Sequence, residues 1–172
     1  MNRQVNSSVK SDQSRAVEPA DRDDLISRRL TFLMHRVMTV TNGAGQPCFR
    51  EWGVSIPEAR ALIGLIEVGD LKVGDLANLI SADVSTLSHL LRRLERSGWV
   101  LRARDEADSR AVRISLTDSG RELARMCRDA SLSHEKILMK GLSQSQVRRL
   151  KDTLEQVYRN AVEGFGGEGL PR

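Results

Sequence analysis

The stretch that decides the fold runs from Asp83 to Thr117 and reads DVSTLSHLLRRLERSGWVLRARDEADSRAVRISLT. Its first part repeats apolar residues at helical spacing, at Val84, Leu87, Leu91 and Leu94, with Leu90 beside them and Gly98 after them. In its last part apolar residues alternate with polar ones, as in a half-buried strand, at Val112, Ile114 and Leu116. We therefore predict a helix, a glycine stop, and two strands (residues 99–104 and 111–116) joined by a polar tip.

The other face of this predicted helix carries small polar and basic side chains: Ser85, Thr86, Ser88, His89, Arg92 and Arg93. A helix that reads the major groove needs one face locked to a scaffold and another that offers short hydrogen-bonding side chains. We interpret the serines, Thr86 and His89 as contacts to base edges or nearby phosphates. The two arginines are candidates for phosphate or guanine contacts.

The hairpin adds to this interpretation through its charge. Residues 92–113 contain seven arginines and four carboxylates, an excess of positive charge that suits a polyanionic partner. Arg110, at the predicted tip, is placed to enter a minor groove, where a narrow width deepens the negative potential. A carboxylate facing phosphate would repel it, so we assign Asp108 to wing support, paired with a nearby arginine. The sequence thus predicts a reading helix with a flanking wing.

Five further helices are expected around this unit. Apolar spacing predicts a long first helix from Ile26, which the glycines and proline of residues 43–47 weaken or end. Ser55, Pro57 and Glu58 mark the start of the second helix, which stops at Gly69. A short third helix has Asp75 in its first turn. Thr117 caps a fifth helix, and Ser143 with Gln146 forms a capping box for a sixth.

These helices define the expected domain organisation. Residues 1–21 are polar and aperiodic, which predicts a disordered tail, and the glycine-rich residues 164–172 are expected to fray. Between them we expect a single domain at 22–163, with the winged helix-turn-helix at about 55–117. The helices at about 22–46 and 117–163 have apolar stripes that the winged helix-turn-helix is too small to cover. Burial of these stripes against a second copy predicts a homodimer.

Composition narrows the class of protein. The chain has 172 residues, a formal net charge of +4 and only 3% aromatic residues, which favours a mainly helical core of aliphatic side chains. No apolar run suits a membrane span or a signal peptide, so a cytoplasmic location is expected. Cys48 and Cys127 are too few and too far apart in sequence for a disulfide framework or a zinc site. We expect no metal and no cofactor.

Three short motifs at fixed spacing resemble the MarR family of bacterial transcriptional regulators: Leu94-Glu-Arg-Ser-Gly98, Asp108-Ser-Arg110 and Leu116-Thr-Asp-Ser-Gly120. The resemblance covers about residues 26–162. It implies a mainly helical fold with a small β-wing, and a homodimer whose reading helices enter successive major grooves of a palindromic site. By the family pattern, Arg110 is the minor-groove arginine of the wing. Ser109 stands where the family often has a second basic residue, which weakens the wing contact.

The resemblance also implies a repressor that leaves DNA when a small effector binds. Family effectors are often phenolic or aromatic acids, sometimes as a coenzyme A thioester, and they bind between the dimer helices and the reader. Phe32, His35 and Trp52 fall on or near segments that could line such a pocket. Core packing or surface placement is the competing interpretation of all three residues.

Three other functions compete with ligand-controlled DNA binding. Redox control through Cys48 is one, because Arg50 lies close enough in sequence to lower the pKa of that thiol. An enzyme is disfavoured: Cys127 and His134 share a helical face but lie about 10 Å apart along it, and no phosphate-binding glycine loop or zinc-ligand spacing is present. A winged helix used only as a protein-interaction module is the third.

Overall fold

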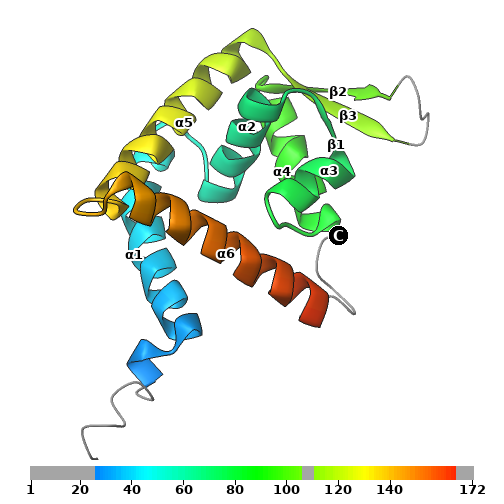
Figure 1. Cartoon of the computed structure of the whole chain (residues 1–172). Coiled ribbons are helices and arrows are strands. Elements are labelled where there is room, and N and C mark those ends of the chain that lie inside the picture. The colour runs from blue at the N-terminus through cyan, green and yellow to red at the C-terminus, as the bar shows by residue number, and fades with distance from the viewer. Residues whose placement is uncertain (1–25, 106–110, 166–172) are drawn as a thin grey trace, which may run out of the picture. The chain divides into compact units, whose positions relative to one another are not determined.

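The computed structural model describes residues 26–105 and 111–165. These residues form mostly helices and one small antiparallel sheet, which confirms the predicted fold class (Figure 1). The predicted tail at 1–21 and the tip of the hairpin lie outside the described residues. None of the helices in the described part is long and apolar enough to cross a membrane.

The described chain divides into two compact units at Thr39 and Val40, within helix α1 (Leu30–Glu51). The first unit contains the short 3-10 turn η2 (Ile26–Arg28) and the first part of α1, and all of its described residues are exposed. The second unit contains the rest of α1 and every other element. Its core is built of aliphatic side chains, and Leu62, Leu76, Leu87, Leu91, Leu94 and Ile114 are fully buried.

Helix α1 corrects one prediction. It continues to Glu51 with Pro47 inside it, whereas the sequence predicted an end near residue 46. Proline removes one backbone N–H and crowds the preceding turn. The last turns are nevertheless held in place, because Phe49 is buried in the core and the buried Gly45 packs against the ring of His134. Tertiary packing outweighs the loss of a single helical hydrogen bond.

Helix α2 (Ile56–Val68) begins as the sequence predicted. Ser55 caps it, and the Ser55 backbone N–H donates to the Glu58 carboxylate at 2.7 Å in a capping box. Gly69 ends the helix with a φ of 97°, a left-handed conformation that favours glycine. Ala59, Leu62 and Leu65 are buried in the core. Glu58 is also buried, which the sequence did not predict.

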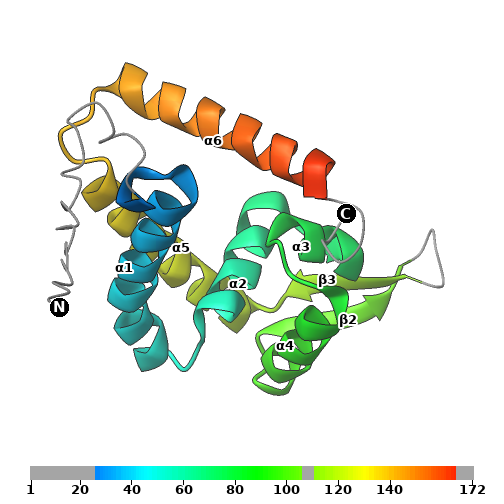
Figure 2. The ribbon, with the colours of Figure 1, turned by 90° about the horizontal axis from the view of Figure 1, so that it is seen from below.

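Helices α3 (Val73–Leu79) and α4 (Val84–Arg96) follow and lie beside α2 (Figures 1 and 2). Leu76 and Ala77 of α3 are buried, and Asp75 lies in its first turn as predicted. The turn between the two helices contains Ser81, whose φ of 53° is unusual for a residue other than glycine. This pair of helices and the turn form the helix-turn-helix.

The sheet has three strands in the order β1-β3-β2: β1 (Leu71–Lys72), β2 (Val100–Arg104) and β3 (Val112–Leu116). Strands β2 and β3 form the predicted hairpin, with Arg102 paired to Ile114. Strand β1 was not predicted, because two residues are too few to show an alternating pattern. It pairs Lys72 with Arg113 and so ties the hairpin to the helix-turn-helix.

A tight joint connects the end of α4 to the start of helix α5 (Asp118–Leu138). Thr117 caps α5, and its hydroxyl donates to the Gly98 carbonyl oxygen at 2.6 Å. The Thr117 backbone N–H donates to the Trp99 carbonyl oxygen at 3.1 Å. Gly120 lies against the same carbonyl so closely that a Cβ atom placed there would be 1.8 Å from the oxygen. Hydrogen bonds and close packing, rather than a flexible loop, therefore connect α4 to α5.

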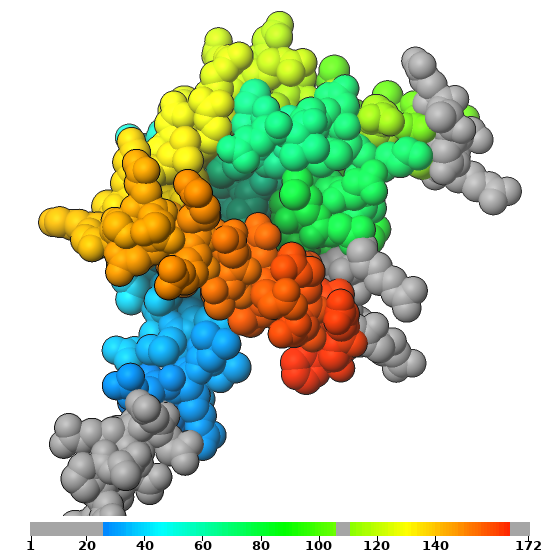
Figure 3. Space-filling view, in the orientation of Figure 1, coloured from blue at the N-terminus to red at the C-terminus, as the bar shows by residue number. Residues whose placement is uncertain are grey.

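The last two helices carry the stripes predicted for dimerisation, but these are less buried than the core. In α5, Leu123, Ala124 and Cys127 are buried, whereas Ile137 is 70% exposed. Helix α6 (Gln144–Phe165) has no buried residue and lies at the surface along its length (Figure 3). It includes Gly164, which the sequence placed in the frayed end. Ser143 and Gln146 form its predicted capping contacts.

Candidate nucleic-acid interface

Helix α4 has the two faces that the sequence predicted. Leu87, Leu91 and Leu94 are fully buried and fix the helix to the core. The exposed face carries most of the predicted contact residues: Ser85, Thr86, His89, Arg92 and Arg93. Val84, which the sequence placed in the apolar stripe, is 53% exposed at the first position of the helix. The face is thus polar, basic and held on a rigid support.

Asp83 caps the first turn of α4. Its carboxylate accepts hydrogen bonds from the Ser85 hydroxyl at 2.6 Å and from the Thr86 backbone N–H at 2.7 Å. These hydrogen bonds hold the pKa of the Asp83 carboxyl well below its usual range, and the bond from Ser85 has the largest effect. The Ser85 hydroxyl is therefore used within the cap, although Ser85 and Thr86 are both exposed.

Replacing Asp83 with alanine is expected to lower the melting temperature at pH 7, because the Thr86 N–H loses its acceptor. The folded-state pKa lies below the unfolded value of 3.8, so the carboxylate stabilises the fold above that pH and loses its effect as the pH falls. Circular dichroism melts should show the gap between wild type and Asp83→Ala narrowing from about pH 5 to about pH 3. Asp118→Ala, which removes a fully exposed carboxylate in the first turn of α5, is the control. A gap that stays constant with pH would contradict the assignment.

Ser88 is less available than the sequence suggested. It is half-buried, and its hydroxyl donates to the Val84 carbonyl oxygen at 2.7 Å. It lines a hollow of about 430 Å³ together with Arg102 of β2 and residues 72–75. Ser88 therefore faces the groove between α4 and the sheet rather than the open face of the helix.

The two adjacent arginines of α4 have different surroundings. Arg92 is exposed, and its Nε donates to the Ser88 carbonyl oxygen one turn earlier. Arg93 reaches the start of α2, where its Nε lies 3.2 Å from a carboxylate oxygen of Glu58 and an Nη donates to the Gly53 carbonyl oxygen at 2.6 Å. Since Glu58 is 2% exposed, this ion pair anchors the last turns of α4 to α2. Sequence reasoning did not identify this partner, because Glu58 is 35 residues away along the chain.

The predicted wing residues Asp108 and Arg110 lie outside the described residues. At the base of the hairpin the structure shows a different carboxylate, Asp105, whose side chain is 1% exposed. It accepts hydrogen bonds from Arg113 at 2.9 and 2.6 Å and lies 3.5 Å from the Lys72 ammonium group. Arg113 also donates to the Asp70 carbonyl oxygen. Asp105 therefore joins all three strands, a role that the alternating pattern of β3 could not reveal.

The predicted effector residues fall in separate parts of the structure. Phe32 and His35 are exposed in the first unit, where the His35 ring lies 3.5 Å from the Thr39 hydroxyl. Trp52, in the second unit, packs against the core and meets Phe49 edge to face, with ring centroids 6.1 Å apart. The core interpretation therefore describes Trp52 better than ligand contact does.

The two cysteines differ in exposure. Cys127 is buried, and this burial, followed by the nearby Cys48, raises the pKa of the Cys127 thiol to about 11. Cys127 thus remains a protonated thiol at neutral pH, which disfavours nucleophilic or redox chemistry there. Cys48 is half-buried in α1. Within residues 26–105 and 111–165, no group of three or more metal-binding side chains comes together.

Comparison with known proteins identifies a family model and related sequences that match this chain. Residues 54–112 match the model of the MarR family. The chain is 32% identical over 152 residues to the HTH-type transcriptional regulator TtmR of Methylorubrum extorquens, an alignment that covers 87% of this chain and 77% of that protein. It is 37% identical over 91 residues to the transcriptional regulator YfiV of Bacillus subtilis, covering 51% of this chain and 57% of that protein.

A solved structure agrees on the fold. The chain superimposes on a cysteine variant of E. coli MarR, crystallised with operator DNA, with a TM-score of 0.66 and 23% identity, over 78% of this chain and 96% of that one. The match to TtmR extends over most of both chains, and the family model covers the helix-turn-helix and the hairpin as far as Val112, the first residue of β3. The chain belongs to the MarR family of DNA-binding transcriptional regulators, which are not enzymes.

Proposed function

We propose that the protein is a homodimer that binds a palindromic operator through its two α4 helices. The observation that carries this proposal is α4 itself, which places Thr86, His89 and Arg92 on an exposed face opposite three fully buried leucines. Short polar and basic side chains on such a helix suit base edges and phosphates in the major groove. Two-fold symmetry places the half-sites about 34 Å apart, one turn of the duplex.

The dimer is supported by apolar side chains that a single chain leaves exposed. In the first unit these include Leu30, Leu33 and Val37, and in the second unit they include Ile137, Leu150 and Leu154. Monomeric proteins rarely leave so many large apolar side chains together at helical spacing. A second copy, which carries the same stripes, is the partner that would bury them.

We further propose that a small effector, such as an aromatic or phenolic acid or its coenzyme A thioester, releases the protein from DNA and relieves repression. A ligand shifts this equilibrium only if it binds better to the dimer whose reading helices are wrongly spaced. Phe32 and His35 remain candidates for its site. Redox control through Cys48 is the alternative trigger.

A salt titration tests the DNA contacts. We expect filter binding of a duplex containing the operator to show affinity that falls steeply with salt, because each phosphate contact releases counterions. Arg110→Ala should weaken binding to many sequences alike, since a wing arginine in the minor groove reads mainly width and potential. His89→Ala should change the preference among sequences, and Ser88→Ala should do so less, because the Ser88 hydroxyl is bonded within the helix.

The same titration distinguishes DNA binding from the alternative function, in which the winged helix binds only other proteins. If affinity does not change with salt, or if no duplex binds, the winged helix serves as a protein-interaction module and the proposed function is wrong. Operator sequences for the titration can be selected from genomic DNA by repeated binding to the purified full-length protein.

A further inference from the structure

A small pocket opens beside the last turns of α4. It has a volume of about 270 Å³ and is lined by Gln46 and Arg50 of α1, by the turn Gly53–Val54–Ser55, and by Arg93. Gln46 and Arg50 also line a neighbouring hollow of about 490 Å³. A water molecule occupies about 30 Å³ in the liquid, so the pocket has room for a partly hydrated phosphate group.

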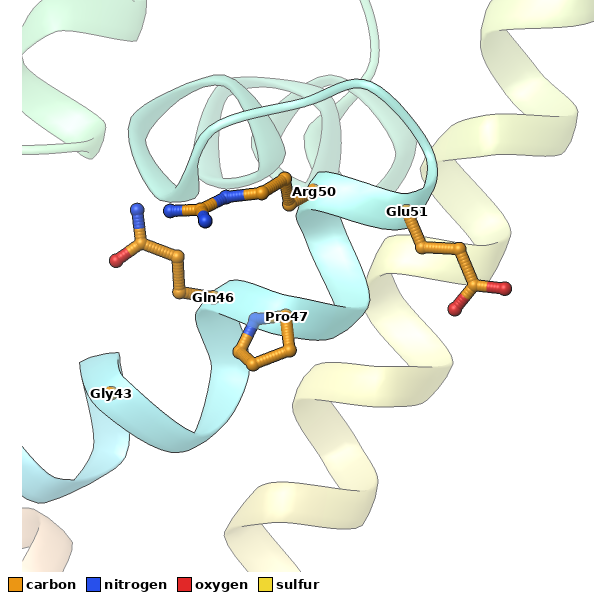
Figure 4. A pocket seen from close by; sticks show the side chains of 5 residues that line it. All are labelled: Gly43, Gln46, Pro47, Arg50 and Glu51. Carbon is orange, nitrogen blue, oxygen red and sulfur yellow. The ribbon is translucent and has the colours of Figure 1, made fainter.

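The lining is cationic. Arg50 and Arg93 are the charged residues of this pocket. Figure 4 shows the side chains of Arg50 and Gln46 on the same side of α1, whereas the carboxylate of Glu51 points away. Among the described residues, no carboxylate forms an ion pair with Arg50. The Arg50 guanidinium therefore has all of its donors available for an anion.

Arg93 is held in place by two contacts, but its guanidinium keeps unused hydrogen-bond donors. Glu58 and the Gly53 carbonyl oxygen take two of its donors, while 51% of the side chain remains exposed. A guanidinium has five N–H donors, so three remain. Because Glu58 already fixes its rotamer, Arg93 would lose little conformational freedom when it binds an anion, and arginine matches the geometry of phosphate.

The position of the pocket indicates the source of the anion. Arg93 follows His89 by one helical turn, about 6 Å along α4, and Arg92 stands next to it on the exposed face. The major groove is about 12 Å wide. A duplex whose bases lie against His89 therefore carries its sugar-phosphate backbone past the last turns of α4, where the pocket opens.

We propose that Arg50 and Arg93 bind one backbone phosphate of the operator at this pocket, an anchor from α1 that is separate from the base-reading residues and from the wing. This inference rests on the proposed DNA binding. It adds the end of α1 to the DNA contacts and makes Arg50 a determinant of affinity rather than of sequence preference.

Arg50→Ala tests the anchor in the full-length protein. We expect the variant to lose about tenfold in affinity for operator and for unrelated duplex alike, the size of one charged hydrogen-bonded contact. The slope of log affinity against log salt should fall by about 0.9, and Arg50→Lys should restore most of it. Arg128→Ala, which removes an arginine paired with Asp129 on α5, is the control and should keep the wild-type slope.

Ethylation interference identifies the contacted phosphate. Among the positions whose ethylation blocks binding of wild type, one in each half-site should become insensitive in Arg50→Ala. If wild type binds with a steep salt slope but Arg50→Ala keeps both the slope and the interference pattern, the anchor is wrong and the proposed function stands. If wild type binds no duplex, the proposed function fails.

A free oxyanion such as inorganic phosphate is the other kind of ligand that has the chemistry this pocket would bind. Inorganic phosphate is titrated into DNA-free protein and followed by the chemical shift of the Ser55 backbone N–H, since Ser55 also lines the pocket and is present in both wild type and Arg50→Ala. Saturable binding below millimolar concentration that Arg50→Ala abolishes, together with an unchanged salt slope for DNA, would overturn the duplex assignment. We expect only weak binding of free phosphate, since one duplex phosphate is positioned by the rest of the interface.

Discussion

Gly120→Ala is expected to destabilise the fold by about 3 kcal/mol or more, a loss of roughly 6–12 °C in melting temperature for a chain of this size. The new methyl group would lie 1.8 Å from the Trp99 carbonyl oxygen, where the obstacle is backbone and cannot rotate away. Either α5 or the strand that follows Gly98 must move. Such a shift breaks the hydrogen bonds of Thr117 to Gly98 and Trp99.

Thermal unfolding of purified protein measures this effect. Gly74→Ala, in the first turn of α3, is the matched control, because a Cβ atom there meets nothing within 4 Å. We expect the control to melt at or slightly above the wild-type temperature, since alanine favours helix over glycine by up to about 1 kcal/mol. Equal melting temperatures for Gly120→Ala and wild type would show that the joint is looser than the structure indicates.

The second large effect is expected at the base of the wing. Asp105→Ala leaves the like charges of Lys72 and Arg113 facing each other without the carboxylate that joins them. Loss of one partner of a buried ion pair costs about 3–5 kcal/mol, and since both cations are partly exposed we expect about 2–3 kcal/mol. The hairpin should also lose its fixed direction, so DNA affinity should fall together with stability.

Chemical denaturation and duplex binding are measured on the same preparation of Asp105→Ala. Asp129→Ala, which breaks an exposed pair with Arg128 on α5, should cost less than about 1 kcal/mol and leave DNA affinity unchanged. Asp105→Asn should fall between wild type and alanine, because the amide keeps one acceptor but not the charge. A fully stable Asp105→Ala would mean that Arg113 holds the wing through the Asp70 carbonyl oxygen alone.

The sequence predicted which faces are buried better than it predicted which residues meet. The leucine spacing of α4 and the caps at Ser55 and Thr117 depend on residues within a few positions of each other, and these predictions are confirmed. Helix α1 passes through Pro47 because distant core contacts hold Phe49. Local propensity cannot include such contacts, so the predicted end of that helix was wrong.

The candidate site shows the same division. The exposed face of α4 follows from periodicity, but the partner of Arg93 depends on how α2 packs against α4. The predicted wing support at Asp108 lies outside the described residues, and the sequence did not indicate that the register of the sheet brings Asp105 to Arg113 and Lys72. Pairings of this kind arise only from the three-dimensional arrangement of elements that are distant in sequence.

The joint at Thr117 and Gly120 makes α5 a lever for the reading helix. Thr117, the cap of α5, is hydrogen-bonded to Gly98 and Trp99, which directly follow α4. A tilt of α5 therefore moves α4 with it. With 21 residues, α5 is about 32 Å long. A tilt of about 5° at its far end, where the proposed dimer contact lies, displaces the other end by about 3 Å, close to the rise of one base pair. The proposed effector would therefore need to move the helices of the proposed dimer very little to shift the two α4 helices away from their grooves.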